Sequence, residues 1–330
     1  MTSSPCSTTK ISIIIPSFNR AYYLNGALET LTHQETDGRF DYEVVIVDNA
    51  SQDNTQEVVE AFAATSPVTV RYLHETKPGD APPRNKGIRE SDGQWLAFFD
   101  DDQFAEPRWL LNMLDAAERH QTQVVGGPVH LDLEQTIIDQ LSLACRSTLR
   151  EMKPYPADQP YETHVIPGTG NILVARTLFD QIGLFEEDIK EGGSDWKLVE
   201  DARATGVIPW YAAAGKIWHR VEENRMTPAY FCWDSRNGGV AQADVDYRKH
   251  GAAGLLARAA ARTLRSATSL PQRILAAVKP PKYGSAQSSM NWWRTEGYLR
   301  RTLTLLAPAA FPQKRFHEYV DFRSGRIVGT

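Results

Sequence analysis

The chain has 330 residues, of which 42% are hydrophobic and 23% charged. This composition is typical of a folded protein with one large domain and an extension, and it argues against disorder. The three cysteines, Cys6, Cys145 and Cys232, form no CxxC pair, which argues against a disulfide framework or a cysteine zinc site. There is no secretory signal and no run of about 18 apolar residues, so we expect a cytoplasmic protein.

The net charge of −5 is unevenly distributed along the chain. From Gly251 onward there are 13 basic and 3 acidic residues, whereas the preceding part has 23 basic and 38 acidic residues. The acidic body argues against nucleic-acid binding, and the basic C-terminal region indicates an anionic partner. Anionic lipid is the natural candidate.

Strand and helix patterns alternate from the first β-branched run onward. Residues 1–10 are expected to be disordered. Strands are predicted at residues 11–15, 42–47, 68–73, 95–99 and 124–125. Helices are predicted at residues 21–33, after Asp53 and Gln56 as a capping pair, after Pro82, and after Pro107. The alternation predicts an α/β fold with a doubly wound, mostly parallel sheet and helices on both faces.

Polar clusters follow three of the predicted strands. PSFNR follows the first, DNASQD the second, and Asp100, Asp101 and Asp102 follow the buried run WLAFF. Ligands of doubly wound sheets bind at the carboxyl ends of the strands. An isolated acidic triplet is more often a solvated loop, but adjacent carboxylates in a crevice need a cation, and oxygen ligands suit Mg²⁺ or Mn²⁺. The three clusters together favour a ligand site.

Two common phosphate-binding motifs are missing from the sequence. There is no GxxxxGK[ST], and no GxGxxG follows the first strand, so a P-loop enzyme or a dinucleotide dehydrogenase is disfavoured. Residues 168–171, GTGN, match only a fragment of the second motif. We interpret them as a loop that lines the site.

Seven motifs, in order, resemble those of family 2 glycosyltransferases with the GT-A fold. They are SIIIPSFNR, VVIVDNASQDNT, APPRNKGI, WLAFFDDDQF, PGTGNILVARTLFDQIGLFEED, GGSDWKLVEDARATG and WHR. The resemblance runs from about Ile11 to about Arg220. It implies a GT-A domain over residues 11–235, with a nucleotide-sugar half at 11–130 and an acceptor half at 131–235. A basic, mainly helical extension at 236–330 follows.

The resemblance implies an inverting transferase that uses Mn²⁺ or Mg²⁺. Such an enzyme moves a sugar from a nucleotide diphosphate sugar, with a UDP-sugar favoured, to a hydroxyl of a glycan or lipid-linked acceptor in surface polysaccharide synthesis. The residues implied to bind the donor are Pro16, Phe18, Arg20, Asp48, Asn49, Arg84, Asp100 and Asp101. The implied metal ligands are Asp102 and His219. Asn49 replaces an acid that many members carry, which leaves the choice of base open.

Inversion needs a base that takes the proton of the acceptor hydroxyl. Asp195 and Asp201 compete for this role, and they cannot face one pocket because six residues span about 240° of a helix. The family pattern puts the base after a glycine-rich turn, which selects Asp195 and leaves Asp201 as a solvated helix acid. The residues implied to line the acceptor site are Gly168, Gly170, Asn171 and Trp196.

After Arg220 the resemblance fades. An irregular stretch is expected at residues 222–254, followed by a helix on which Arg258, Arg262 and Arg265 share one face. Such a basic amphipathic helix either binds a membrane surface or packs on the catalytic domain with its charges outward. Aromatic and basic residues recur at 292–301. They would suit a peripheral association with the inner face of the plasma membrane, and the sequence leaves both alternatives open.

Two other functions compete with glycosyl transfer. A sugar-1-phosphate nucleotidyltransferase would also use an α/β crevice and Mg²⁺, but it predicts a glycine-rich N-terminal loop, and PSFNR contains no glycine. A non-catalytic glycan- or membrane-binding module on the same scaffold is the second alternative. The presence of both Asp102 and Asp195 argues against it.

Overall fold

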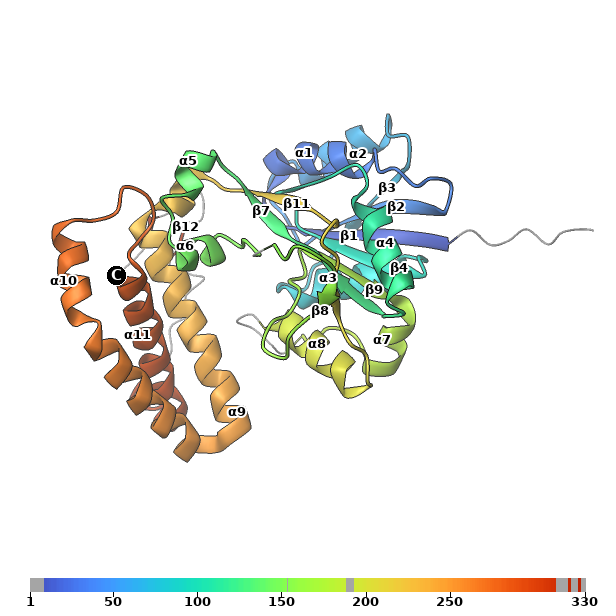
Figure 1. Cartoon of the computed structure of the whole chain (residues 1–330). Coiled ribbons are helices and arrows are strands. Elements are labelled where there is room, and N and C mark those ends of the chain that lie inside the picture. Colours follow the sequence, from blue (N-terminus) through green and yellow to red (C-terminus); the bar gives the residue numbers. More distant parts are fainter. Residues whose placement is uncertain (1–8, 153, 188–192, 313–319, 322–325, 328–330) are drawn as a thin grey trace, which may run out of the picture. The chain divides into compact units, whose positions relative to one another are not determined.

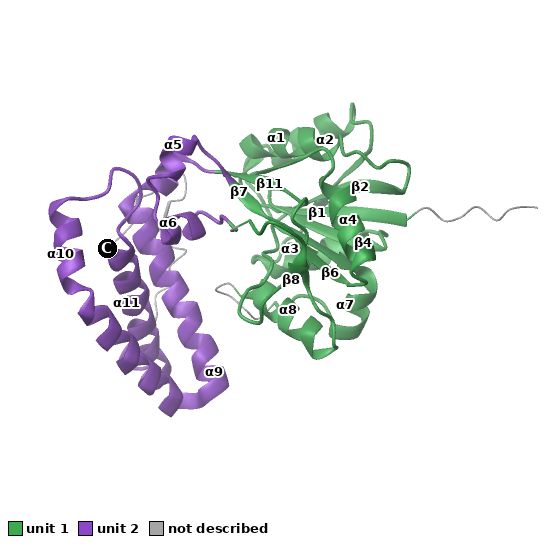
Figure 2. Cartoon of the chain, viewed as in Figure 1, with its two compact units in different colours: residues 1–130, 152–220 green, residues 131–151, 221–330 purple. Residues whose placement is uncertain are grey.

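The structure, a computed structural model, describes residues 9–152, 154–187, 193–312, 320–321 and 326–327. The chain forms two compact units (Figure 2): residues 1–130 with 152–220, and residues 131–151 with 221–330. The boundary thus falls at residue 220 and not at 235, and residues 131–151, expected in the acceptor half, belong to the second unit. Of the expected disordered terminus, residues 1–8 lie outside the described residues, and Thr9 and Lys10 begin a strand.

An eight-stranded sheet organises the first unit (Figure 1). Its order is β3-β2-β1-β4-β9-β6-β10-β8. The pairs among β1 to β4 are parallel, whereas β9 is antiparallel to both of its neighbours. The strands are β1 (Thr9–Ser17), β2 (Phe40–Asp48), β3 (Thr69–His74), β4 (Trp95–Phe99), β6 (Val124–Gly126), β8 (Gln159–Pro160), β9 (Asn171–Ala175) and β10 (Trp210–Tyr211). The mostly parallel sheet predicted from the sequence is confirmed.

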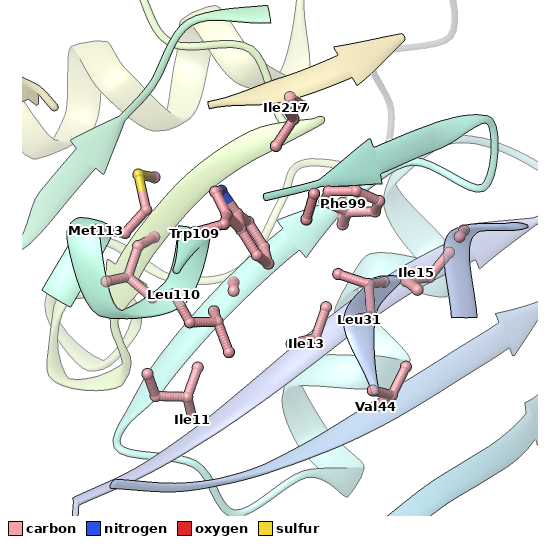
Figure 3. Close-up of a cluster of buried hydrophobic side chains, with 14 of the residues drawn as sticks. Ile11, Ile13, Ile15, Leu31, Val44, Phe99, Trp109, Leu110, Met113 and Ile217 are labelled. Atoms are coloured by element: carbon pink, nitrogen blue, oxygen red, sulfur yellow. The ribbon is translucent and has the colours of Figure 1, made fainter. Parts of the chain in front are cut away.

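Helices cover both faces of this sheet because successive side chains of β1 point in opposite directions. Ile11, Ile13 and Ile15 pack with α1 and α4 in the cluster of Figure 3, whereas Ile14 packs with α3, α7 and α8. All four isoleucines are fully buried, and burial of each side chain contributes about 1.5–3 kcal/mol. Burial on both faces explains why residues 11–15 are apolar except for Ser12, whose hydroxyl donates a hydrogen bond to Glu43.

The described part of the first unit contains the predicted helices and one more, α7, that the sequence did not predict. They are α1 (Ala21–Leu31), α2 (Thr55–Ala63), α3 (Ala81–Glu90), α4 (Trp109–Arg119), α7 (Arg176–Ile182) and α8 (Ser194–Ala204). The expected capping pair of α2 is wrong, because its N-cap is Asn54. Asp53 instead accepts a hydrogen bond at 3.1 Å from the backbone N–H of Ala21, the first residue of α1.

Shorter elements complete the chain. A three-stranded sheet has the order β5-β11-β7. Its strands are β5 (Gln103–Ala105), β7 (Val129–Asp132) and β11 (Ile217–Arg220). In the second unit, β12 (Val320–Asp321) pairs with β13 (Arg326–Ile327). The other elements are helices α5 (Gln135–Ile138), α6 (Leu143–Thr148), α9 (Pro228–Thr268), α10 (Leu270–Val278) and α11 (Gln287–Leu306) and the 3₁₀ turn η1 (Glu223–Met226).

Helix α9 replaces most of the stretch expected to be irregular. Thr227 starts it as an N-cap, since its hydroxyl accepts a hydrogen bond from the backbone N–H of Tyr230 at 3.3 Å, and Pro228 takes the first helical position. The helix bends at Gly251, whose φ of 63° lies outside the helical region. No helix of the described residues is both long enough and apolar enough to cross a bilayer.

Helices α9 and α11 approach each other closely at two glycines. A Cβ on Gly239 would lie 2.0 Å from the carbonyl oxygen of Arg294, and one on Gly297 would lie 2.1 Å from that of Arg236. Arg236 also binds Glu296 at 2.7 Å across the two helices. The two backbones therefore touch where only glycine fits.

The expected outward basic face of α9 is wrong for two of its three arginines. The guanidinium of Arg262 lies 4.6 Å from the centre of the Tyr298 ring on α11, and Arg258 lies 3.8 Å from Asp246. Only Arg265 of the three is exposed. Much of the positive charge of this region is thus used inside the helical unit.

Replacing Gly239 by alanine should destabilise the helical unit by about 1–3 kcal/mol, because the new methyl group would overlap a backbone carbonyl. Gly238→Ala is the matched control. Its Cβ would meet nothing closer than the Arg294 side chain at 3.4 Å, and alanine favours helix by about 1 kcal/mol over glycine. In thermal unfolding, the melting temperature should therefore fall for Gly239→Ala and rise for Gly238→Ala. Equal melting temperatures would contradict the close approach.

Candidate active site

The loops that follow β1 and β2 lie side by side at the carboxyl edge of the sheet. The backbone N–H of Asn19 donates to Ser51 Oγ at 2.8 Å, and the N–H of Gln52 donates to Asn19 Oδ1 at 2.7 Å. The N–H of Asn49 reaches the carbonyl of Ser17 at 2.8 Å. Asn19 adopts a positive φ of 54°, a conformation that asparagine tolerates better than most residues. Two of the predicted polar clusters therefore form one surface.

Arg20 joins this surface to the acidic triplet after β4. One of its guanidinium nitrogens, Nη1, lies 3.0 Å from Asp101 Oδ1 and 2.8 Å from Asp102 Oδ2. Ser17 donates a hydrogen bond to the other carboxylate oxygen of Asp101 at 2.8 Å. Both aspartates are buried, so a single cation from α1 compensates two carboxylates from the end of β4.

His219 lies on the opposite side of Asp102 from Arg20. Strand β11 pairs with β5, and this pairing brings His219 Nε2 to 3.4 Å from Asp102 Oδ1. The backbone N–H of Arg220 donates to the carbonyl of Asp102 at 2.9 Å. Ligand atoms at right angles on a divalent ion with bonds of about 2.1 Å are about 3 Å apart. The carboxylate and the imidazole therefore fit two adjacent positions on one ion.

The metal would need further ligands from outside the protein. No group of three acidic, histidine or cysteine side chains converges in a metal-binding arrangement within the described part of the chain. Oxygen-rich sites for Mg²⁺ commonly combine one or two carboxylates with substrate phosphates and water. Asp102 and His219 fit such an incomplete site.

Burial and neighbouring charges shift the pKa values of Asp100, Asp101 and Arg20. Burial raises the pKa of Asp101 to about 6, with Arg20 acting against the shift and Asp102 adding to it. Burial and the charge of Asp102 likewise raise the pKa of Asp100. The pKa of Arg20 rises although burial acts to lower it, because Asp101 and Asp102 favour its charged form. The site is thus an electrostatically coupled group.

Asp48 and Asn49, both predicted to bind the donor, have different surroundings. Asp48 is buried, and it accepts hydrogen bonds from Tyr72 at 2.6 Å and from the backbone N–H of Ser51 at 2.9 Å. The amide of Asn49 donates to the carbonyl of Lys77 at 2.7 Å and accepts from the N–H of Gly79 at 3.2 Å. Asn49 therefore secures the loop after β3, and we assign it a structural role.

Phe18, Pro16 and Arg84 border the same edge. Phe18 is 56% exposed, unusual for a phenylalanine and suited to stacking. Pro16 lies within β1, opposite Val47 of β2. Arg84 donates from Nη1 to the carbonyl of Asp80 at 2.8 Å, but its buried Nε has no hydrogen-bond partner among the described residues. A buried donor of this kind favours an anionic ligand.

The glycine loop before β9 connects the triplet to Asp195. A Cβ on Gly170 would lie 2.5 Å from Asp100 Oδ2, so only glycine allows this approach. A Cβ on Gly168 would lie 4.0 Å from Asp195 Oδ2, and the backbone N–H of Thr169 lies 3.4 Å from the same oxygen. Asp195 is in the first turn of α8 and remains partly exposed. The loop thus spans the two predicted catalytic regions.

The predicted acceptor contact of Asn171 is not supported by its surroundings. Its side chain is 1% exposed, accepts a hydrogen bond from the Trp109 indole at 2.8 Å, and donates to the carbonyls of Pro128 and Gly215, both at 3.0 Å. All of its polar groups are engaged inside the fold. Trp196 differs, since its buried indole N–H has no partner among the described residues. Asp201 forms an ion pair with Lys197 on the same helix.

Comparisons with known proteins identify the family of the chain. The model of the family described as Glycosyl transferase family 2 matches residues 12–183. The chain belongs to this family. The match covers the sheet from β1 to β9, with the acidic triplet and the glycine loop.

Curated relatives of the chain are named as glycosyltransferases. Glycosyltransferase AglE of Haloferax volcanii is 26% identical over 185 residues, which are 56% of this chain and 58% of that protein. The poly(ribitol-phosphate) beta-N-acetylglucosaminyltransferase TarS of Staphylococcus aureus is 28% identical over 116 residues, which are 35% of this chain and 20% of that protein. The chain spans little more than half the length of the first curated relatives it matches.

Two solved structures share the fold. The mannosyltransferase PcManGT of Pyrobaculum calidifontis, in complex with GDP-Man and Mn²⁺, has a TM-score of 0.59 at 20% identity, covering 90% of this chain and 88% of that one. TarS of Staphylococcus aureus, in complex with UDP, has a TM-score of 0.50 at 14% identity, covering 94% and 77%. The expected GT-A fold with a helical C-terminal region is confirmed.

Three supporting residues were missed by the sequence reasoning. Ser17 binds Asp101, Tyr72 binds Asp48, and the side-chain oxygen of Gln103 accepts a hydrogen bond from the backbone N–H of Asp100 at 3.1 Å. Ser17 and Gln103 lie inside quoted motifs, so their position at a strand end was a usable signal. Tyr72 gave none, because its role depends on the register between β2 and β3.

Asp101→Asn should stabilise the free protein at pH 7 by about 1–3 kcal/mol. The native carboxyl holds its proton up to about pH 6, above the ordinary value of 3.8. The native state therefore binds more protons than the unfolded state in this window, and stability falls as the pH rises through it. In chemical denaturation measured from pH 4 to 7, the free energy of unfolding of the variant should not show this decrease.

Asp41→Asn, at an exposed position of β2, is the control and should follow the wild-type profile. Lower stability of Asp101→Asn at pH 7 would show the opposite balance, in which pairing with Arg20 outweighs the cost of burying the charge.

Proposed function

We propose that the chain is an inverting, metal-dependent glycosyltransferase. It moves a sugar from a nucleotide diphosphate sugar, with UDP favoured, to a hydroxyl of a glycan or lipid-linked acceptor in surface polysaccharide synthesis. One observation carries the proposal. In this family 2 chain the glycine loop lies against Asp195 at one end and against the acidic triplet at the other, and Arg20 and His219 contact the same triplet.

The donor would occupy the carboxyl edge of the sheet. The exposed ring of Phe18 offers a surface for the base, with Pro16 and Asp48 beside it, and Arg20 and the unpaired Nε of Arg84 offer positive charge to the phosphates. The neighbours TarS and PcManGT are seen with UDP and with GDP-Man. This supports a nucleotide sugar as donor, and the preference for UDP remains part of the proposal.

The metal site would be Asp102 with His219. A bound divalent ion supplies positive charge that stabilises the departing diphosphate. Asp101 holds Arg20 in place, and Asp100 supports the turn through Gln103. In this arrangement Arg20 would contribute fixed positive charge to the leaving group, and Asp102 with His219 would hold the metal.

Asp195 would act as the base from the opposite side of the sugar. Its carboxylate takes the proton of the acceptor hydroxyl while the oxygen of that hydroxyl bonds to the anomeric carbon and the bond to the diphosphate breaks. The N–H of Thr169 orients one of its oxygens. Gly168 and the indole N–H of Trp196, which has no partner among the described residues, would contact the acceptor. Gly170 acts through its close approach to Asp100.

The setting we propose is the inner face of the plasma membrane, with an anionic lipid surface as partner of the basic C-terminal unit. The chemical reason is that a lipid-linked acceptor would already lie at that surface. Of the two alternatives, nucleotidyl transfer receives no support from the loop after β1, which has no glycine. A non-catalytic module would not need the Asp102 and Asp195 pair.

The purified protein should release nucleoside diphosphate from a panel of UDP-, GDP- and dTDP-sugars when Mn²⁺ or Mg²⁺ and an acceptor extract are supplied. Chelator should abolish the release, because the leaving group would lose its stabilising charge, and excess metal should restore it. Release that is insensitive to chelator, or none with any donor, would count against the proposed reaction.

Asp102→Ala should remove metal-dependent donor binding, measured by calorimetry. Asp195→Asn should leave donor binding intact and slow transfer by at least about 10², because only the proton acceptor is lost. Asp201→Asn, on the same helix, is the matched control and should be active. Equal loss of donor binding in the Asp102 and Asp195 variants would overturn the division of roles.

A further inference from the structure

Helix α10 packs with its apolar side outward. Leu270, Ile274, Leu275 and Val278 are 50%, 59%, 66% and 79% exposed, and no residue of the helix is buried. A surface helix of a folded protein normally turns such residues inward. Large apolar side chains gathered on one exposed face indicate an interaction surface.

The geometry of the helix explains why its apolar side chains point outward. At about 100° per residue, the four aliphatic side chains fall within one arc of about 140°. Arg273 and Ala276 occupy the other side, and these two are the only partly covered residues of the helix. The guanidinium of Arg273 lies 4.2 Å from the ring centre of Trp292 on α11. The helix is thus attached through an arginine, and its aliphatic arc faces away.

The charge around this arc has a single sign. Residues 251–295 contain seven basic residues and no acidic one. Arg265, Lys279 and Lys282 are exposed. Leu264 on the preceding helix is 71% exposed as well. Leu275 and Lys279 also line a cleft of about 550 Å³ beside the helix. Exposed aliphatic groups with flanking ammonium groups match the boundary between headgroups and acyl chains.

We propose that α10 is the element that docks on an anionic lipid bilayer, with its aliphatic arc in the headgroup region and Lys279 and Lys282 at the lipid phosphates. This inference deepens the proposed membrane partner and moves it from the arginines of α9 to another helix, since Arg262 packs on Tyr298 of α11 and Arg258 pairs with Asp246. A second copy of the chain is disfavoured as occupant, because it would bring two basic surfaces together.

Flotation of the full chain with vesicles tests the proposal. The wild type should float with phosphatidylcholine vesicles that contain phosphatidylglycerol and far less with phosphatidylcholine alone. The variant I274Q/L275Q/V278Q should lower the bound fraction at least about tenfold. K279E/K282E should remove the preference for anionic vesicles together with its salt sensitivity.

I208Q is the control, since Ile208 is 59% exposed in the first unit, and it should float like the wild type. Unchanged thermal unfolding of each variant establishes that the fold is retained. Wild-type flotation of the triple variant would overturn the proposal. A concentration-dependent dimer that the triple variant loses, without vesicle binding by the wild type, would also overturn it and assign the face to a second copy.

The assay contains neither donor nor acceptor. Failure to float with intact release of nucleoside diphosphate would therefore contradict only the docking of α10, whereas flotation without any release would contradict the proposed transfer.

Discussion

The structure of the site depends on one guanidinium. Arg20 stands at the start of α1 and reaches across to the end of β4, where it compensates Asp101 and Asp102 together. Two buried carboxylates so close together would otherwise keep a proton or draw in water. The parallel pairing of β1 with β4 sets the separation between these groups. The strand order of the sheet therefore also determines which charged side chains meet in the site.

The sequence predicted the parallel part of the fold well, for a physical reason. Strands buried on both faces become continuous apolar runs, as in residues 11–15 and 95–99. Polar residues follow them at the edge of the sheet, where side chains and backbone groups of neighbouring loops supply hydrogen-bond partners. The antiparallel β9 was not predictable in this way. Its pairing of Asn171 with Phe99 is a contact between distant segments, and periodicity carries no information about such partners. The interpretation of Asn171 failed for that reason.

Helix α9 shows the converse failure. Gly238 and Gly239 lower local helix propensity, so the sequence suggested irregular structure. In the fold, Gly239 is needed because α11 passes against it, and Gly297 serves the same purpose from the other side. Tertiary contact thus reverses the local signal. The same contact takes up Arg262, which the net charge alone had suggested was free to meet lipid.

Residues 131–151 have a consequence for how such chains can diverge. They lie inside the span matched by the family model, yet Leu141, Cys145 and Leu149 are buried with Phe231 and Met290 in the second unit. The C-terminal helices are therefore not a detachable appendix. Deleting or exchanging them would leave an internal segment of the catalytic region with an uncovered apolar face. Inheritance of a new C-terminal region would require compensating changes more than 70 residues upstream, because residues 131–151 and the C-terminal helices form one packed unit.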